Sequence, residues 1–271
     1  MAVTATRQVW AFDCEWAPDV VAGRRLYHLG AEVPDAEVMR VMFENAPDFD
    51  RVANPQPFLK TVLCRVVSIA AVVRVEKGDD AQLFLWALPE HPDDHTVTEA
   101  DILRRFLEKV GAANPLLVGF NSKAADLHIL AQRSIVHGLR LPGFARELSA
   151  KPWEMNSCDL LDLLGGRGRA FGCSLNEIAS LCGIPGKLDV TGDDVAGLFY
   201  GGKLADIVRY NVFDALTTYL LWLRVEHFRG AFTTEGYALE QQRVRDLLAA
   251  EAAKPGGEYL RLYAEAWAAQ N

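Results

Sequence analysis

Three runs of strand-forming residues come before the first convincing long helix, and this order limits the folds that the chain can adopt. Residues 8–13 (QVWAFD) are short and mostly apolar, 61–75 (TVLCRVVSIAAVVRV) are rich in β-branched side chains, and 82–88 (QLFLWAL) continue the pattern. These runs predict a short strand, a long strand that is either continuous or bent, and a third strand. Successive strands of this kind favour an antiparallel meander that opens a mixed sheet.

The segment between the first two predicted strands, residues 17–58, is too long for a turn and too often interrupted for a strand. Because proline lacks a backbone N–H and fixes its own φ, we expect an elaborated insertion with one helical segment at 35–45. The prolines of this segment are Pro18, Pro34, Pro47, Pro55 and Pro57.

The chain then alternates between helix and strand before it becomes helical. Residues 99–111 and 124–137 have the apolar spacing of helices, and 115–120 (PLLVGF) predict a buried strand between them. We therefore predict one α/β domain over 1–230, a mixed β-sheet flanked by helices, with a C-terminal helical extension at 231–271 packed on the same domain. The remaining predicted helices are 158–164, 174–183 (with Ser174 and Glu177 in capping-box spacing), 192–200, 203–228, 235–253 and 257–269.

The amino-acid composition indicates a globular protein. Half of the 271 residues are apolar and 24% are charged, as in a globular protein with a substantial core. The net charge of −8 means that any nucleic-acid partner must be held by a local basic rim or by bridging metal ions.

The chain has no apolar run near the roughly 18 residues of a membrane span, and its five cysteines form no C-x-x-C pair. We expect a cytoplasmic protein, off the membrane, with reduced cysteines.

Two acidic residues lie at the end of the first predicted strand. Side chains two residues apart in a strand point to the same face, so Asp13 and Glu15 should converge. Two carboxylates that follow an apolar strand make a plausible cation site. A D-x-E pattern is also common in solvated turns, and alone it is a weak indication.

Two other acidic positions have simple structural explanations when each is considered alone. Asp126 falls in the first turn of the predicted helix 124–137, where the helix dipole favours an acid. Tyr210 and Asp214 are four residues apart and share one face of the predicted helix 203–228, which is a common arrangement. A buried tyrosine with a hydrogen-bonded hydroxyl would also fit that position.

Considered together and in order, these acids resemble a known pattern. The set is similar to the DEDDy group of 3′-to-5′ exonucleases, which have a ribonuclease H-like fold. It is closest to the branch related to the proofreading exonuclease domain of family B DNA polymerases. The resemblance extends over roughly residues 8–228, in the segments FDCEWAPD, VGFNSKAADLHIL, CDLLDLL, SLNEIASLCGIPGKLDVTGDDVAGL and YNVFDALTTYLLWLR.

The resemblance implies a two-metal-ion phosphodiester hydrolase. Asp13, Glu15 and Asp214 would bind one Mg²⁺ or Mn²⁺ ion, and Asp13 with Asp126 would bind a second. Tyr210 would orient the attacking water. A ligand set of carboxylates without cysteine or histidine is the one that hard divalent cations prefer.

The same segments suggest substrate contacts and show departures from the group. Asn121 is a candidate to hydrogen-bond the terminal nucleotide, and Trp16 either stacks on a base or packs in the core. Ala125 stands where an aromatic residue is usual and His128 where proline is frequent; neither is a metal ligand, so we expect altered substrate packing and an intact metal site. Asp159, in CDLLDLL, is interpreted as a helix-start acid, with support of the site as the alternative.

The function expected from the resemblance is removal of 5′-mononucleotides from a free 3′ end of single-stranded nucleic acid, with DNA favoured over RNA. Two alternatives stay open. One is a catalytically weak or inactive nucleic-acid-binding module of the same fold, and the other is a metallophosphoesterase that acts on small substrates. The C-terminal helices would cap the fold or form the face of a homodimer.

Overall fold

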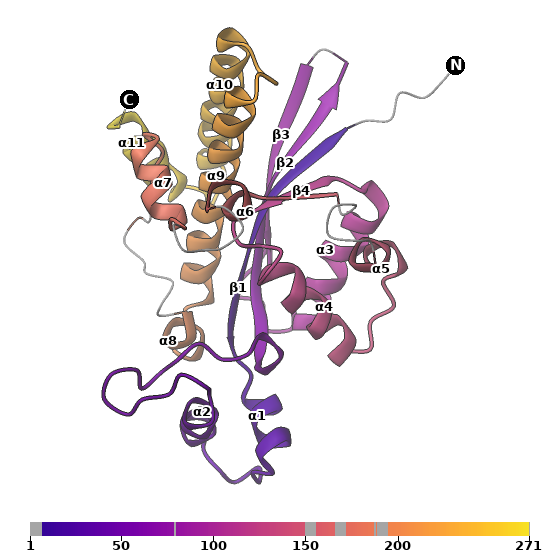
Figure 1. The fold of residues 1–271 in the computed structure, drawn as a ribbon, viewed down its shortest axis with the longest axis vertical. Helices are drawn as coiled ribbons and strands as arrows, with labels where there is room; N and C mark the ends of the chain where they lie inside the picture. The colour runs from indigo at the N-terminus through magenta and orange to yellow at the C-terminus, as the bar shows by residue number, and fades with distance from the viewer. Residues whose placement is uncertain are drawn as a thin grey trace.

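A mixed five-stranded sheet forms the centre of the protein (Figure 1). The computed structural model describes residues 7–78, 80–149, 156–165, 172–186, 188 and 195–270. The strands are β1 (Gln8–Pro18), β2 (Cys64–Lys77), β3 (Asp80–Leu88), β4 (Leu116–Gly119) and β5 (Ser157–Asp159), in the order β3-β2-β1-β4-β5. β2 is antiparallel to its neighbours β1 and β3, whereas β1, β4 and β5 run parallel to one another. The predicted meander that opens a mixed α/β sheet is confirmed, and the arrangement is consistent with a ribonuclease H-like fold.

Helices cover both faces of the sheet because its central strands are apolar on both sides (Figure 1). Along β1, Val9 and Ala11 belong to one buried cluster, and Trp10 and Phe12 belong to another. The first cluster contains the helices of the C-terminal part of the chain, which are α6 (Leu160–Gly165), α7 (Leu175–Leu181), α9 (Leu204–Phe228), α10 (Thr234–Ala252) and α11 (Leu260–Ala268). The second contains α3 (Glu99–Ala113), α4 (Asp126–Val136) and α5 (Pro142–Ser149).

The insertion after β1 differs from the prediction in two ways. β1 continues to Pro18 instead of ending near residue 13, because the acidic part of the strand still pairs with β2. The insertion also contains two helices, α1 (Val20–Tyr27) and α2 (Asp35–Glu44), of which only the second was predicted. Gly23 lets these helices pack closely, since a Cβ there would lie 2.5 Å from the sulfur of Met42.

Other predicted elements need smaller corrections. β2 begins at Cys64, after a 3₁₀ turn at Thr61–Leu63, instead of at residue 61. The segment predicted as a helix at 158–164 begins as β5, which pairs with β4, and only then becomes α6. α5 was not predicted, and α8 (Val195–Tyr200) matches the later part of the helix predicted at 192–200, whose residues 192–194 lie outside the described part.

A buried ionic cluster attaches the insertion to the domain. The guanidinium of Arg133 on α4 contacts Asp19 Oδ2 at 2.6 Å and Glu99 Oε2 at 2.7 Å. Asp19 also caps α1 by accepting hydrogen bonds from two backbone N–H groups, and Glu99 accepts one from the backbone N–H of Val66 on β2. The cluster therefore joins the start of the insertion to α3, α4 and the sheet.

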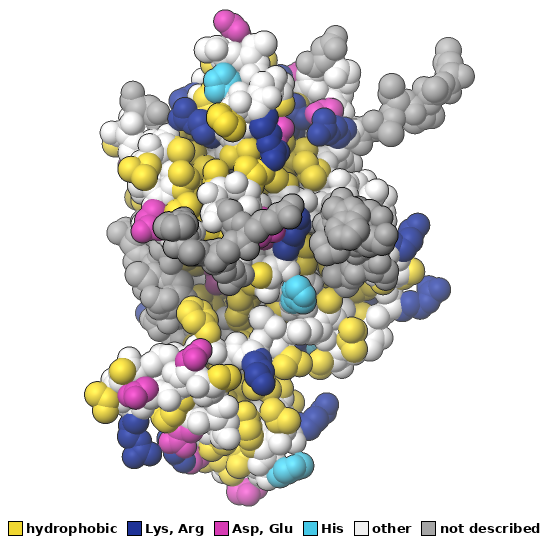
Figure 2. All heavy atoms as spheres, in the orientation of Figure 1, with side chains coloured by type: hydrophobic (Ala, Val, Ile, Leu, Met, Phe, Trp, Pro, Cys, Tyr) yellow, Lys and Arg dark blue, Asp and Glu magenta, His cyan; other side chains and the backbone are white. Residues whose placement is uncertain are grey.

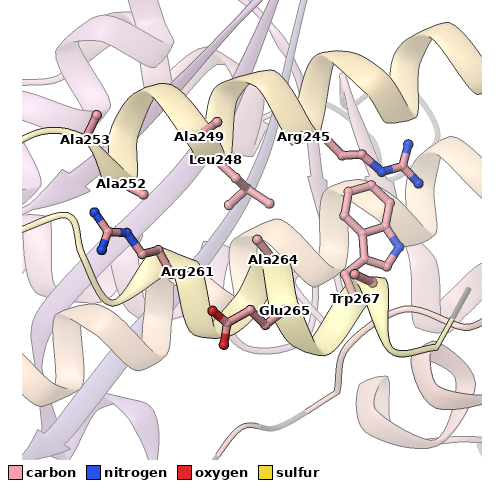
Figure 3. Close-up of a pocket in the computed structure, with 10 residues that line it drawn as sticks. Arg245, Leu248, Ala249, Ala252, Ala253, Arg261, Ala264, Glu265 and Trp267 are labelled. Atoms are coloured by element: carbon pink, nitrogen blue, oxygen red, sulfur yellow. The ribbon is translucent and has the colours of Figure 1, made fainter.

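The C-terminal helices are joined to the sheet by a second buried ion pair. Arg74 of β2 contacts Glu240 of α10 at 2.8 Å, and both side chains are less than 10% exposed. Figure 3 shows how α11 lies against α10, with Arg245 over the ring of Trp267 at 4.5 Å from its centroid. None of the helices in the described part of the chain combines the length and apolar composition needed to cross a membrane.

Candidate active site

Three carboxylates from distant parts of the sequence meet on one face of β1. Asp13 and Glu15 point to the same side of the strand, and Asp214 reaches them from α9, which packs across β1 and β2. One carboxylate oxygen of each residue lies within 4.8 Å of the others. The predicted convergence of Asp13 and Glu15 is thus observed, and Asp214 completes a group that offers a divalent cation three hard oxygen ligands.

One register shift between β1 and β2 lies next to this group of carboxylates. The pairing of β1 with β2 shifts between Glu15, which lies opposite Ser68, and Trp16, which lies opposite Val66. Next to this irregularity, Asn211 of α9 donates a 3.0 Å hydrogen bond from Nδ2 to the hydroxyl of Ser68. Both side chains are completely buried. The bond therefore holds α9 against β2 at the level of Glu15.

Tyr210 lies one turn before Asp214 on α9 and is buried. Burial raises the pKa of Tyr210 far above its usual value, and the negative charges of Asp214 and Glu15 and a hydrogen bond with Asp214 act in the same direction. The phenol is thus protonated at neutral pH. It can donate a hydrogen bond and orient a neighbouring group, but it cannot act as a strong base.

Asp126 lies beside this group, not within it. It is the first residue of α4, as expected, and its Oδ1 accepts a 3.2 Å hydrogen bond from the backbone N–H of Cys14. That N–H belongs to the residue between Asp13 and Glu15, so Asp126 is anchored to the same segment of β1. Burial is the main cause that raises its pKa to about 7, with the charge of Asp159 acting in the same direction.

The raised pKa of Asp126 predicts how stability depends on pH. In metal-free buffer, the folded protein keeps this proton up to about pH 7, whereas an unfolded aspartate releases it near about pH 3.9. The folded state then binds more protons in this interval, so the contribution of Asp126 to the free energy of unfolding should fall as pH rises from about 4 to about 7. Urea titrations of wild type and Asp126→Asn across this interval measure it. The free energy of unfolding of the wild type should decline with pH relative to that of the variant. Parallel curves would contradict the raised pKa of Asp126.

Asp159 has a larger role than its sequence position indicated. It ends β5 and is 4% exposed. Its Oδ1 accepts the backbone N–H of Asn121 and its Oδ2 accepts that of Lys123, both at 2.9 Å. It also accepts the backbone N–H of Leu161 at 3.0 Å, which fits the predicted position at a helix start. Asp159 therefore fixes the loop that leads from β4 to Asp126.

The two predicted substrate-contact residues belong to different segments, Asn121 to the loop after β4 and Trp16 to β1. Asn121 follows β4 in a left-handed backbone conformation with φ of 62°, held by the bond to Asp159. Trp16 is half-buried and lines a groove together with Glu15. The residues of the insertion that line the same groove were not predicted, because no sequence pattern connects them to β1.

A family model described as "Predicted 3'-5' exonuclease related to the exonuclease domain of PolB" matches residues 56–267, well over half of the chain. The matched range contains Asp126, Tyr210 and Asp214, whereas Asp13 and Glu15 precede it. The comparison with curated proteins gave no match.

Among solved structures, the chain matches the family B DNA polymerase from the hyperthermophilic archaeon Pyrobaculum calidifontis. It is 17% identical, with a TM-score of 0.43 over 78% of this chain and 23% of the polymerase chain. The present chain thus spans about a quarter of the polymerase's length. On the strength of the family model, the chain belongs to the family of predicted 3′-5′ exonucleases related to the exonuclease domain of PolB.

Proposed function

We propose that the protein is a metal-dependent 3′-to-5′ exonuclease. Its substrate would be a free 3′ end of single-stranded nucleic acid, with DNA preferred to RNA, and its products 5′-mononucleotides. The observation that carries the proposal is the convergence of Asp13, Glu15 and Asp214 within 4.8 Å, with Tyr210 one turn before Asp214 on the same helix. Family membership supports the same reaction class.

The donor set fits two Mg²⁺ or Mn²⁺ ions. Asp13, Glu15 and Asp214 would hold one ion, and Asp13 with Asp126 would hold the other. Bound cations supply the positive charge that a phosphodiester transition state requires. They also explain how an acidic site accepts a polyanion, because they reverse the local field. On the face shown in Figure 2, Lys and Arg side chains are scattered among acidic ones, which fits binding through ions instead of a broad basic patch.

The protein's own side chains would position the reactants. The protonated hydroxyl of Tyr210, oriented by Asp214, would hold the attacking water in line with the scissile bond. Asn121 would contact the terminal nucleotide, presented by the loop that Asp159 fixes. We assign these roles to residues 1–230 and treat 231–271 as a helical extension on the same domain, on the basis of the buried Arg74–Glu240 pair.

The test uses single-stranded DNA and RNA oligonucleotides labelled at the 5′ end. With Mg²⁺ or Mn²⁺, we expect a ladder of products shortened from the 3′ end, complete loss of cleavage in excess EDTA, and no cleavage when the 3′ end is chemically blocked. A small phosphate ester assayed in parallel separates the remaining possibilities. Hydrolysis of the ester alone would identify a small-substrate phosphoesterase, and binding of oligonucleotides without cleavage would identify an inactive binding module. Undiminished cleavage in EDTA would exclude the metal-dependent mechanism.

A further inference from the structure

The two edges of the sheet differ greatly in length. β5 forms one edge and has three residues, whereas β3 forms the other edge and has nine (Figure 1). In the described part of the chain, the backbone–backbone hydrogen bonds of β3 are those of its ladder with β2. The other side of β3 therefore presents a row of backbone N–H and C=O groups to solvent or to a further strand.

The sequence of β3 does not have the features that usually protect a long edge strand, which are a lysine, a proline or a bulge. Residues 81–88 (AQLFLWAL) contain no charged residue and no proline, and β3 keeps one register with β2 throughout. Phe84 is 48% exposed, and Leu83, Leu85 and Trp86 are only half-buried. A further strand beside β3 would cover more of these apolar side chains, which is favourable.

The order of residues in β3 is nearly symmetric about Phe84. A leucine lies on each side of it, and an alanine lies three positions away on each side, in the order A-Q-L-F-L-W-A. Antiparallel pairing of two copies about this centre places residues of the same type opposite each other: Phe84 with Phe84, Leu83 with Leu85, and Ala81 with Ala87. Apolar cross-strand pairs stabilise a sheet, and the acidic residue of the strand, Asp80, falls opposite Leu88, so it does not meet a like charge.

Space for a second strand is open beside the later half of β3. A groove with a volume of about 580 Å³ is lined there by Leu85, Trp86 and Ala87, and across from them by Arg209 and Tyr259. Consecutive side chains of a strand point to opposite faces of the sheet, so a groove that touches all three residues lies along the edge of the strand. Symmetry about Phe84 would place residues 81–83 of the second copy in this groove.

We propose that β3 pairs in antiparallel orientation with β3 of a second copy of this chain, with Phe84 at the two-fold axis. The two five-stranded sheets then form one continuous sheet. The assembly closes at two copies, because the pairing uses the same edge of both and the opposite edge, β5, has only three residues. The inference is independent of the proposed exonuclease function, since β3 contributes no residue to the three-carboxylate group.

The first test measures molar mass by light scattering during size-exclusion chromatography at micromolar concentrations. Wild type should have about twice the mass of one chain. Phe84→Lys should have the mass of one chain, because two positive charges would face each other at the axis. Phe58→Lys is the matched control, since Phe58 is 90% exposed on the insertion and lies outside β3, and it should keep the wild-type mass. A wild-type mass of one chain, or a dimer that survives Phe84→Lys, would overturn the inference.

A cross-link reports the same contact even when Phe84→Lys fails to fold. Directly opposed residues of an antiparallel pair are close enough for a disulfide, so Phe84→Cys should give a covalent dimer under mild oxidation. Wild type, with its five native cysteines, and Phe58→Cys should stay uncross-linked under the same conditions. If wild type is dimeric and Phe84→Cys does not cross-link, or if the controls cross-link equally, the copies associate through another surface and the pairing through β3 is wrong.

Discussion

Replacing Asp214 with asparagine is expected to reduce 3′-end hydrolysis by roughly a thousandfold, which corresponds to about 4 kcal/mol of transition-state stabilisation. Asp214 is the residue that α9 contributes to the three-carboxylate group, so the change replaces a charged carboxylate ligand with a neutral, weaker amide oxygen. The metal-free protein should stay folded and become slightly more stable, because Asp13 and Glu15 lose a like-charged neighbour. Single-turnover cleavage in Mn²⁺ and thermal unfolding in EDTA measure the two effects.

Two variants on the same helix serve as references for Asp214→Asn. Asp206→Asn removes an exposed carboxylate whose ion pair with Arg209 is 3.3 Å long, and it should change neither activity nor stability appreciably. Tyr210→Phe keeps the ring and removes the hydroxyl, so we expect slower turnover than wild type but a milder loss than Asp214→Asn. Marked destabilisation by Asp214→Asn in EDTA, with activity retained in Mn²⁺, would show that Asp214 has a structural role.

Replacing Arg133 with methionine is expected to destabilise the fold by about 3–5 kcal/mol. The guanidinium is buried, and it contacts Asp19 and Glu99, which are buried as well. Methionine fills much of the space but leaves the buried carboxylate of Asp19 without its ion-pair partner, and it leaves Glu99 with only the contact to His137 at 2.7 Å among the ion pairs of the described residues. Urea unfolding at neutral pH measures the loss.

The control for Arg133 is Arg104→Met on α3. Arg104 is 47% exposed and pairs only locally with Asp101, so its replacement should change stability by less than about 1 kcal/mol. Because Asp19 starts the insertion, Arg133→Met should also increase proteolysis within residues 19–60 before global unfolding. Equal effects of the two substitutions would indicate that the buried cluster contributes no more than a surface ion pair.

The fold was predictable where local pattern and tertiary packing agree. The β-branched run of β2 and the apolar periodicity of α3 and α9 identified the main elements. α1 was missed because it is short, contains Gly23, and depends on packing against Met42 of α2. β5 was taken for helix because its three residues become a strand only through pairing with β4, a contact that local sequence does not encode.

The part of the site that could be predicted from sequence is the part that residue spacing determines. The two-residue spacing of Asp13 and Glu15 and the four-residue spacing of Tyr210 and Asp214 each place two side chains on one face. Residue spacing did not reveal the side chains that hold the site in place. Asp159 and Asn211 act through hydrogen bonds to residues 36 to 143 positions away, and the groove joins β1 to the insertion only after folding.

The placement of Tyr210 and Asp214 on α9 has a consequence for the motions open to the site. α9 is 25 residues long, and most of its side chains are buried against the sheet and the C-terminal helices. Local opening of such a helix would expose much of the core, so its backbone amides should exchange with solvent only through global unfolding.

The insertion, with few buried side chains in α1 and α2, should open at much lower free energy. The insertion would then open locally while α9 stays folded. Thermal loss of catalysis should therefore coincide with melting of the core, and substitutions in the insertion should cost the least stability.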